Sequence, residues 1–227
     1  MRKMRITWLG QAGLFIKTSE AAVLIDPYFS DCVGKIAPEK KRRVPAPDFL
    51  WNIKPDFLIF THDHIDHYDP ETAPHFLSMT HPITVLSPSG VWEKARASGG
   101  RHNYVLFNEG TEWSEKGIRF SAVKAVHSDP NAVGVVLEAE NKTVYIAGDT
   151  LFSKKVIEAL PSSIDMAFLP VNGAGNNMNM TDAVRFARLS GAKRAVPVHW
   201  GMMDDIDSDA FNFENRYIPE IYKEFEV

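Results

Sequence analysis

Three histidines and two aspartates stand within six residues, from His62 to His67, in the stretch FLIFTHDHIDHYDP. An apolar segment typical of a buried strand runs directly into them. His62 and His64 are two positions apart and project to the same side of an extended chain, whereas Asp66 and His67 lie beyond the following bend. Imidazole and carboxylate groups suit borderline divalent cations, zinc first and also manganese or iron. The stretch therefore predicts a metal site that needs further ligands from elsewhere in the chain.

Three other apolar, strand-like segments also end in a metal-capable residue: SAVKAVHSD, TVYIAGDT and AVPVHWG. Because α/β proteins gather their sites at strand ends, we expect these residues to join the first cluster. The candidate metal ligands are His62, His64, Asp66, His67, His127, Asp149 and His199. They are too many for one tetrahedral centre with an open position, but they suit two ions about 3.5–4 Å apart that share a carboxylate and a water. Hydroxide formed from that water would be the nucleophile of a hydrolytic reaction.

The elements that must position these residues alternate between sheet-forming and helical segments in both halves of the chain. This pattern predicts an α/β fold with two sheets sandwiched between helices. The continuous apolar segments PDFLIFTH and IDMAFLPVN predict strands that are buried on both faces. One helix is predicted to begin after Thr181 as its N-cap and to end before Gly191, and another is predicted in ENRYIPEIYKEF near the C-terminus. No linker or repeat divides the 227 residues, so one domain over residues 1–227 is expected.

Charge and cysteine content narrow the classes of partner. The formal net charge of −4, from 25 Lys and Arg against 29 Asp and Glu, argues against a general nucleic-acid binder. Cys32 is the only cysteine, so neither a disulfide framework nor a Cys-rich metal site is expected. No apolar run approaches the ~18 residues that span a bilayer, and no convincing signal-peptide cleavage site follows the N-terminal segment. These features favour a cytoplasmic protein that acts on a small molecule, and they leave homo-oligomerisation open.

The ordered set THDHIDH, VH, GDT and PVHWG resembles the metallo-β-lactamase superfamily, as does the opening ITWLGQAGLFIKT…LIDPYFSD. The resemblance implies a four-layer αββα sandwich with a dinuclear metal site at one edge. It assigns His62, His64 and His127 to the first ion, assigns Asp66, His67 and His199 to the second, and places Asp149 as a bridge between them. Asp66 would also steady the attacking water or take up a proton. Asp26, in the family's DP after an early strand, would support a ligand loop from outside the metal shell.

Differences among branches of the superfamily narrow the resemblance. Asp149 replaces the cysteine ligand of one class of zinc β-lactamases, and no segment matches the helical substrate domain of glyoxalase II. Asp69 after DHY, with AFLPVNGAGNNMN and PVHWGM, resembles the ascorbate-6-phosphate lactonases and, more distantly, the N-acylphosphatidylethanolamine phospholipase D. The expected activity is therefore metal-dependent hydrolysis of an ester bond, in a lactone or sugar-phosphate lactone. A phosphodiesterase of the same fold is the alternative, and a non-catalytic metal-binding protein is the contrasting class.

Two further segments have both a functional and an ordinary interpretation. The basic run Lys40, Lys41, Arg42 and Arg43 either contacts an anionic substrate or forms a solvated loop face. The loop GAGNNMN, with Asn176 and Asn177, either approaches the substrate with its backbone or is a turn that tolerates positive φ. We expect the 27–55 segment and this loop to form the pocket walls. Outside the ligand set, His75, His81 and His102 are expected to be solvated or locally bonded, and Cys32 to be a small, partly buried side chain.

Overall fold

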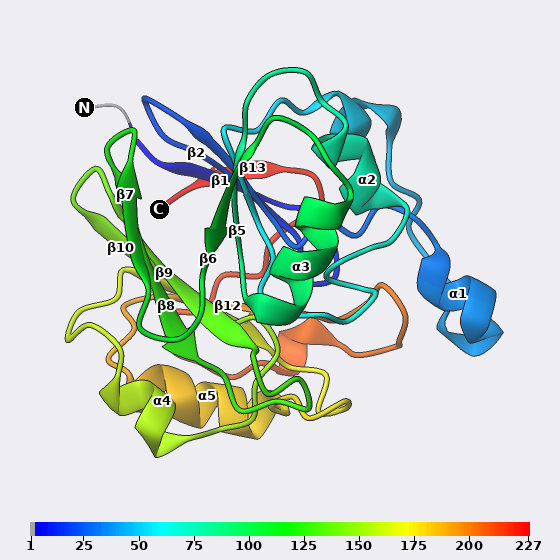
Figure 1. Ribbon diagram of the computed structural model, residues 1–227. Helices are drawn as coiled ribbons and strands as arrows, with labels where there is room; N and C mark the ends of the chain where they lie inside the picture. The colour runs from blue at the N-terminus through cyan, green and yellow to red at the C-terminus, as the bar shows by residue number, and fades with distance from the viewer. Residues whose placement is uncertain (1–2) are drawn as a thin grey trace.

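The computed structural model describes residues 3–227 and consists of two β-sheets packed face to face, with helices against both outer faces (Figure 1). The first sheet contains, in spatial order, β13 (Glu224–Glu226), β1 (Arg5–Trp8), β2 (Leu14–Lys17), β3 (Ala22–Ile25), β4 (Phe57–Ile59), β5 (Thr84–Ser87) and β6 (Asn103–Leu106). The second contains β12 (Ala195–Val198), β11 (Met166–Pro170), β10 (Lys142–Ile146), β9 (Val133–Ala139), β8 (Ile118–Lys124) and β7 (Glu112–Glu115).

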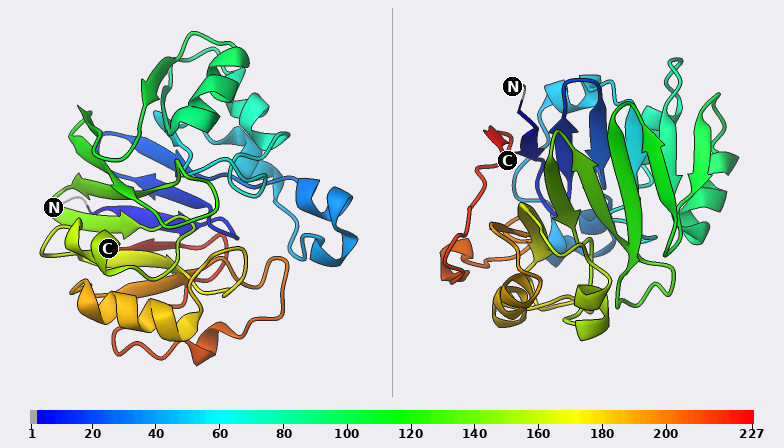
Figure 2. Two further views of the ribbon diagram at one scale, coloured as in Figure 1. Left: turned by 60° about the horizontal axis from the view of Figure 1, so that its bottom comes forward. Right: turned by 90° about the vertical axis from the view of Figure 1, so that its left-hand side faces the viewer.

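The helices are short. Residues of α2 (Thr72–Leu77), α3 (Ser89–Ala97) and the 3-10 turn Asp48–Asn52 pack in an apolar core on the outer face of the first sheet. Helix α1 (Cys32–Ile36), with the 3-10 turn Pro38–Lys40 after it, projects away from the sheets (Figure 1). The helices near the second sheet are α4 (Lys154–Glu158), α5 (Met180–Leu189) and the 3-10 turn Ser208–Ala210. Figure 2 shows α2 and α3 on one side of the sandwich and the orange-yellow α5 along the other. None of the helices in residues 3–227 is long and apolar enough to cross a membrane.

Successive side chains of the central strands pack into different apolar cores, which produces the layers of the sandwich. In β4, Phe57 and Ile59 belong to the apolar core between the sheets, whereas Leu58 packs in a second core with α2 and α3. In β11, Phe168 faces the core between the sheets and Leu169 faces α5. Successive residues of a strand point to opposite faces, so a strand covered on both sides must be apolar throughout. The predicted αββα sandwich is confirmed.

Strand direction brings the candidate ligands to one edge. In the second sheet, β8 and β10 are both antiparallel to β9 and therefore run the same way, and β10, β11 and β12 are parallel. The carboxyl ends of β8, β10 and β12 consequently meet at one edge, and these ends precede His127, Asp149 and His199. In the first sheet, β4 is parallel to its neighbours β3 and β5 and delivers the 62–67 stretch.

Two sequence predictions about helices need correction. The N-cap of α5 is Asn179, whose side chain accepts a hydrogen bond from the Asp182 backbone N–H, and Thr181 is already inside the helix. The segment predicted as a C-terminal helix is irregular and then forms β13, which pairs antiparallel with β1. Pro219 lacks the N–H that a helix interior needs, and the open edge of the first sheet offers backbone partners instead.

Candidate metal centre

All seven candidate ligands lie together at the strand ends, in two groups. The first group is His62, His64, His127 and Asp149, and the second group is Asp66, His67 and His199. Within each group, one nitrogen or oxygen atom of every residue lies within 4.8 Å of the corresponding atoms of the others. Residues up to 137 positions apart in the sequence, from His62 to His199, thus meet at a single edge of the sandwich.

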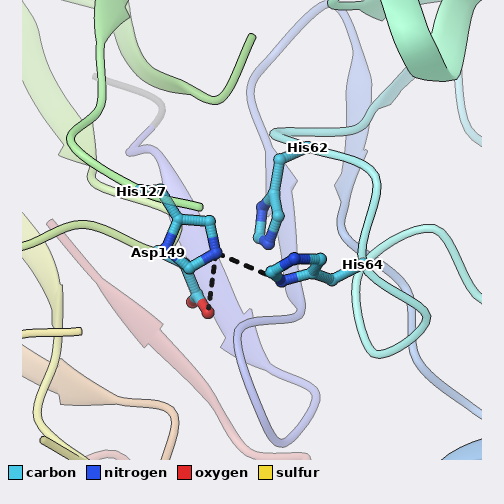
Figure 3. Close-up of side chains that lie close together, drawn as sticks. All are labelled: His62, His64, His127 and Asp149. Carbon is cyan, nitrogen blue, oxygen red and sulfur yellow. Dashed lines mark hydrogen bonds and ion pairs between the residues drawn. The ribbon is translucent and has the colours of Figure 1, made fainter. Parts of the chain in front are cut away.

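The side chains of the first group turn toward one another from three strand ends (Figure 3). His127 Nε2 lies 3.1 Å from His64 Nδ1 and 3.9 Å from Asp149 Oδ2. Burial, assisted by the nearby His67, holds the pKa of His62 well below its ordinary value, and burial also lowers the pKa of His127. Both imidazoles are therefore neutral near pH 7, which is the form that binds metals.

The second group combines two histidines with a carboxylate that is ionised. His199 Nε2 lies 3.2 Å from Asp66 Oδ2, and His67 Nε2 lies 3.9 Å from the same oxygen. Burial by itself would lower the pKa of His199, but the carboxylates of Asp149 and Asp66 outweigh it and raise this pKa to about 10. Burial would likewise lower the pKa of His67, but Asp149 and Asp66, with Asp26, outweigh it and raise this pKa. The site thus has enough negative charge to hold positive charge at its centre.

Asp149 contacts both groups. Its Oδ1 lies 3.2 Å from His67 Nε2, and its Oδ2 lies 3.4 Å from His199 Nε2 while accepting a 2.8 Å hydrogen bond from Asn177 Nδ2. Burial would raise the pKa of Asp149, but His199 and His67 together hold it well below its ordinary value. An ionised carboxylate thus lies between histidines of the two groups.

Buried atoms without hydrogen-bond partners test whether these residues fit a metal. Among the described residues, such atoms include His62 Nε2, His67 Nε2 and Asp149 Oδ1. The last two are close to each other, but their geometry makes no hydrogen bond. Buried polar atoms nearly always have a partner, and a divalent cation is one that nitrogen and carboxylate oxygen atoms can share. The donor set therefore fits a divalent metal.

Asp26 fixes the orientation of His67 from behind. Its Oδ2 lies 2.8 Å from His67 Nδ1 and accepts a 2.6 Å hydrogen bond from Thr61 Oγ1, while its Oδ1 accepts from the Thr61 backbone N–H. This places Asp26 where a supporting residue was predicted, and it leaves His67 Nε2 facing Asp149. Gly148 lies against the same threonine, where a Cβ atom would be only 2.9 Å from the Thr61 side chain. The glycine of the GDT motif is thus needed for Asp149 to approach this closely.

Gln11, in the turn between β1 and β2, is a site residue that the sequence analysis missed. Its Nε2 donates a 2.8 Å hydrogen bond to Asp66 Oδ2 and lies 3.0 Å from His199 Nε2. Its side chain is buried, and its φ of 50° is uncommon for a residue other than glycine. Strained backbone of this kind gathers at functional sites, and His199 shares it with a φ of 61°. The sequence feature that could have indicated this role is a polar residue between Gly10 and Gly13 in an otherwise apolar opening segment.

A cavity of about 530 Å³ opens over Asp66, Asp149 and His199. Its walls come from the 63–66 stretch, from the 172–177 segment and from residues 203–206. The sequence analysis did not single out the last of these three segments. The 27–55 segment contributes only Val33 and Lys40. The predicted walls are therefore partly correct, and the part after His199 is new.

Asn176 and Asn177 both line this cavity, but they hold the candidate ligands. Asn177 donates to Asp149, and the Asn176 carbonyl oxygen lies 3.3 Å from His127 Nδ1. Asn176 also has the positive φ, 64°, that the turn interpretation expected. Asn176 and Asn177 of this loop thus each contact one residue of the first group.

The structure corrects the assignment of Arg42 to substrate binding. Its guanidinium is buried and donates to the carbonyl oxygens of Tyr28 and Val44 and to the Tyr222 hydroxyl, at 2.5, 2.7 and 2.9 Å. A side chain that satisfies buried carbonyls in this way cannot also reach a substrate.

The other three residues of the basic run differ in their contacts and surroundings. Arg43 pairs with Asp205, Lys41 is exposed and does not line the cavity, and Lys40 does line it.

The remaining histidines and the cysteine have local roles, as predicted. His75, His81 and His102 each place Nε2 within 3.1 Å of a backbone carbonyl oxygen. Cys32 is buried and donates its S–H to the Ile65 carbonyl oxygen at 3.2 Å.

Comparison with known proteins identifies the family to which a protein with this fold and this site belongs. Residues 21–200 match the family described as "Beta-lactamase superfamily domain". A relative named "UPF0173 metal-dependent hydrolase" from Ligilactobacillus salivarius (strain UCC118) is 30% identical over 240 residues, covering 99% of this chain and all of its own length. The chain therefore belongs to the metallo-β-lactamase superfamily and, within it, to the UPF0173 family of metal-dependent hydrolases.

Solved structures agree with the fold over the whole chain. The metallo-β-lactamase fold protein YhfI from Bacillus subtilis superimposes with a TM-score of 0.75 at 16% identity, covering 100% of both chains. An isothiocyanate hydrolase from Delia radicum gut bacteria superimposes with a TM-score of 0.74 at 19% identity, covering 99% of both chains. At these identities the likeness concerns the fold alone.

Proposed function

We propose that this protein hydrolyses an ester bond with the help of two divalent cations, zinc first and manganese or iron as alternatives. The first cation would be held by His62, His64 and His127, the second by Asp66, His67 and His199, and Asp149 would bridge them. The position of Asp149 carries the proposal, because its two carboxylate oxygens face histidines of both groups at 3.2–3.9 Å. The unpartnered His62 Nε2 and His67 Nε2 supply one free donor atom for each cation.

Bound divalent cations lower the pKa of water from 15.7 toward ~7 and polarise the bond under attack. Hydrolysis then joins the water oxygen to the carbonyl carbon and breaks the bond from that carbon to the ester oxygen. One water proton must leave the nucleophile, and one must reach the departing alkoxide.

Asp66 is the group that this chain offers for the proton transfers. Its carboxylate borders the cavity, and its side chain is 18% exposed. Burial would raise its pKa, but His67 and His199 outweigh that effect, so Asp66 is ionised at neutral pH and its oxygens can accept a hydrogen bond from the attacking water. Gln11 donates to Asp66 Oδ2 and so fixes the carboxylate for this role. Asp149, the second catalytic candidate, would act by holding both cations.

An ester in a lactone or sugar-phosphate lactone is the first substrate class, supported by the resemblance of the Asp69 and GAGNNMN segments to ascorbate-6-phosphate lactonases. A phosphodiester is the alternative, for which Lys40 is the cavity cation on this chain. A non-catalytic metal-binding protein is disfavoured because all seven ligands are present and converge. The proposed setting is a single domain over residues 1–227 that acts in the cytoplasm on a small molecule rather than a nucleic acid, alone or as a homo-oligomer.

The test begins with elemental analysis of protein purified without added metal. Loaded and chelator-treated protein are then assayed on lactones, carboxylic esters and phosphodiesters. We expect about two equivalents of metal and turnover of a lactone or ester that chelation removes. The Asp66→Asn variant should keep its metal content better than its activity. Fully loaded protein that turns over none of the three substrate classes would contradict the proposal.

A further inference from the structure

We infer that the substrate carries an uncharged, apolar group beside the scissile ester bond, and that Ile65, Met203 and Ile206 form the wall that receives it. This inference rests on the proposed ester hydrolysis and names its substrate class. It favours alkyl-substituted lactones and acyl esters over sugar phosphates and phosphodiesters.

The first observation is the apolar surface next to the candidate metal ligands. Ile65 stands between His64 and Asp66 in the sequence, lines the same cavity as both, and is 38% exposed. Met203 and Ile206 line the cavity from the segment that follows His199, and both are half-buried. Ligand pockets characteristically combine such apolar walls with a few polar groups at the reacting end. Here the polar groups are those of the candidate metal centre, and Ile65, Met203 and Ile206 supply apolar wall.

The second observation is the charge of the remaining walls. Among the described residues, Lys40 is the only lysine or arginine that lines the cavity, and the acidic residues Asp63 and Asp204 line it as well. Asp63 is held by Lys94 Nζ at 2.6 and 2.8 Å. Sites that bind a phosphate away from a metal usually present arginine forks or several cations to it. Walls of this composition suit an uncharged group better than a second anionic one.

The third observation explains what Arg43 does instead of binding an anion. Its backbone N–H donates a 2.9 Å hydrogen bond to the Met202 carbonyl oxygen, and its guanidinium pairs with Asp205. Both contacts tie the loop of the basic run to the 202–206 segment. Asp204 Oδ1, in that segment, accepts from the backbone N–H groups of Gly201, just before it, and of Ile206, at 2.8 and 3.1 Å. Arg43 therefore anchors the apolar wall and holds Met203 and Ile206 beside the cavity.

The experiment measures kcat/KM of the metal-loaded, full-length protein on p-nitrophenyl esters from acetate to octanoate and on γ-lactones with alkyl chains of increasing length. We expect kcat/KM to rise by about fourfold per added methylene over the first few carbons, the factor that corresponds to ~0.8 kcal/mol per buried CH₂. The variants Met203→Gln and Ile206→Asn should flatten this dependence and keep the metal content of the parent. Leu189→Gln, an exposed apolar residue on α5 that does not line this cavity, is the matched control and should keep the full slope.

A binding measurement decides the matter independently of turnover. Isothermal titration of the loaded protein with uncharged 2-alkanones from butanone to nonanone should give a Kd that falls with chain length, with a smaller slope in Met203→Gln. Rates and Kd values that ignore chain length, or a preference for bis(p-nitrophenyl) phosphate over every ester, would overturn the apolar wall and leave a metal-dependent hydrolase standing. Chain-length-dependent binding by loaded protein that turns over nothing would support the wall and contradict the proposed hydrolysis.

Discussion

The Asp26 carboxylate lies 2.8 Å from Nδ1 of His67, and both side chains are completely buried. This contact requires Nδ1 to carry the proton, and it leaves Nε2 as the free donor atom beside Asp149. Asp26 is held in turn by Thr61, the residue immediately before the histidine-rich stretch. A buried carboxylate thus sets which atom of His67 faces Asp149 of the first group.

Replacing Asp26 by asparagine should weaken this control. Asparagine tolerates the positive φ of 43° at this position, so the fold should survive, but its amide can present N–H to His67 Nδ1 and favour the wrong tautomer. We expect metal affinity or kcat/KM to fall by roughly 10–100-fold, the usual effect of losing such a support. Competition with a metal-binding dye measures the affinity. The control is Asp165→Asn, because Asp165 directly precedes the first residue of β11, whereas the candidate ligands follow the last residues of their strands. Equal metal affinities in the two variants would show that Asp26 does not support metal binding through His67.

Asp149→Ala should lose metal from both groups. Removal of a carboxylate that faces His67, His127 and His199 leaves two cations opposed with less negative charge between them. We expect affinity to weaken by about 100-fold or more, beyond the effect of an outer support, and activity to fall with it. Elemental analysis after gel filtration measures the metal that stays bound. Retention of both equivalents with near-normal turnover would show that Asp149 does not bridge.

Arg42→Gln should destabilise the fold and leave substrate choice unchanged. The guanidinium satisfies the buried Tyr28 carbonyl oxygen and the Val44 carbonyl oxygen, which is partly buried, and a buried acceptor left unpartnered costs about 1–3 kcal/mol. We expect a loss of about 2–4 kcal/mol, which for a chain of this size lowers Tm by roughly 4–15 °C. The exposed Lys41→Gln should leave Tm unchanged in the same thermal scan. The anion-clamp interpretation predicts a different result, a loss of about tenfold or more in kcat/KM on a phosphodiester at unchanged stability.

Cys32 should resist alkylation in the folded protein. The side chain is 5% exposed, and burial raises the pKa of its thiol to about 12, so the reactive thiolate is scarce at pH 8. We expect labelling by iodoacetamide at pH 8 to be about a thousandfold slower than that of an ordinary thiol. In guanidinium chloride the same protein should label at the ordinary rate, which checks the reagent. Rapid labelling under native conditions would show that α1 opens readily.

The positions of the candidate ligands could be predicted from the chain because each follows an apolar strand, and a strand buried on both faces leaves a continuous apolar run such as FLIF. The supporting role of Asp26 came from the family resemblance, and its contact with His67 joins the ends of two parallel strands. Gln11 escaped prediction because a lone glutamine in a turn has no periodic pattern. Its contact with Asp66 depends on how β1 and β2 lie beside the 62–67 stretch.

The sequence by itself determined which residues could hold a metal, because imidazole and carboxylate chemistry belongs to the residue type and strand periodicity is local. Only the tertiary structure decided what the residues of the basic run contact, because side chains that are adjacent in the sequence point to different parts of the protein. Arg42 turns inward to the Tyr28 and Val44 carbonyl oxygens, Arg43 holds the segment after His199, and Lys40 reaches the cavity. The direction of each side chain depends on which buried acceptors the fold places nearby, and those acceptors come from distant parts of the chain.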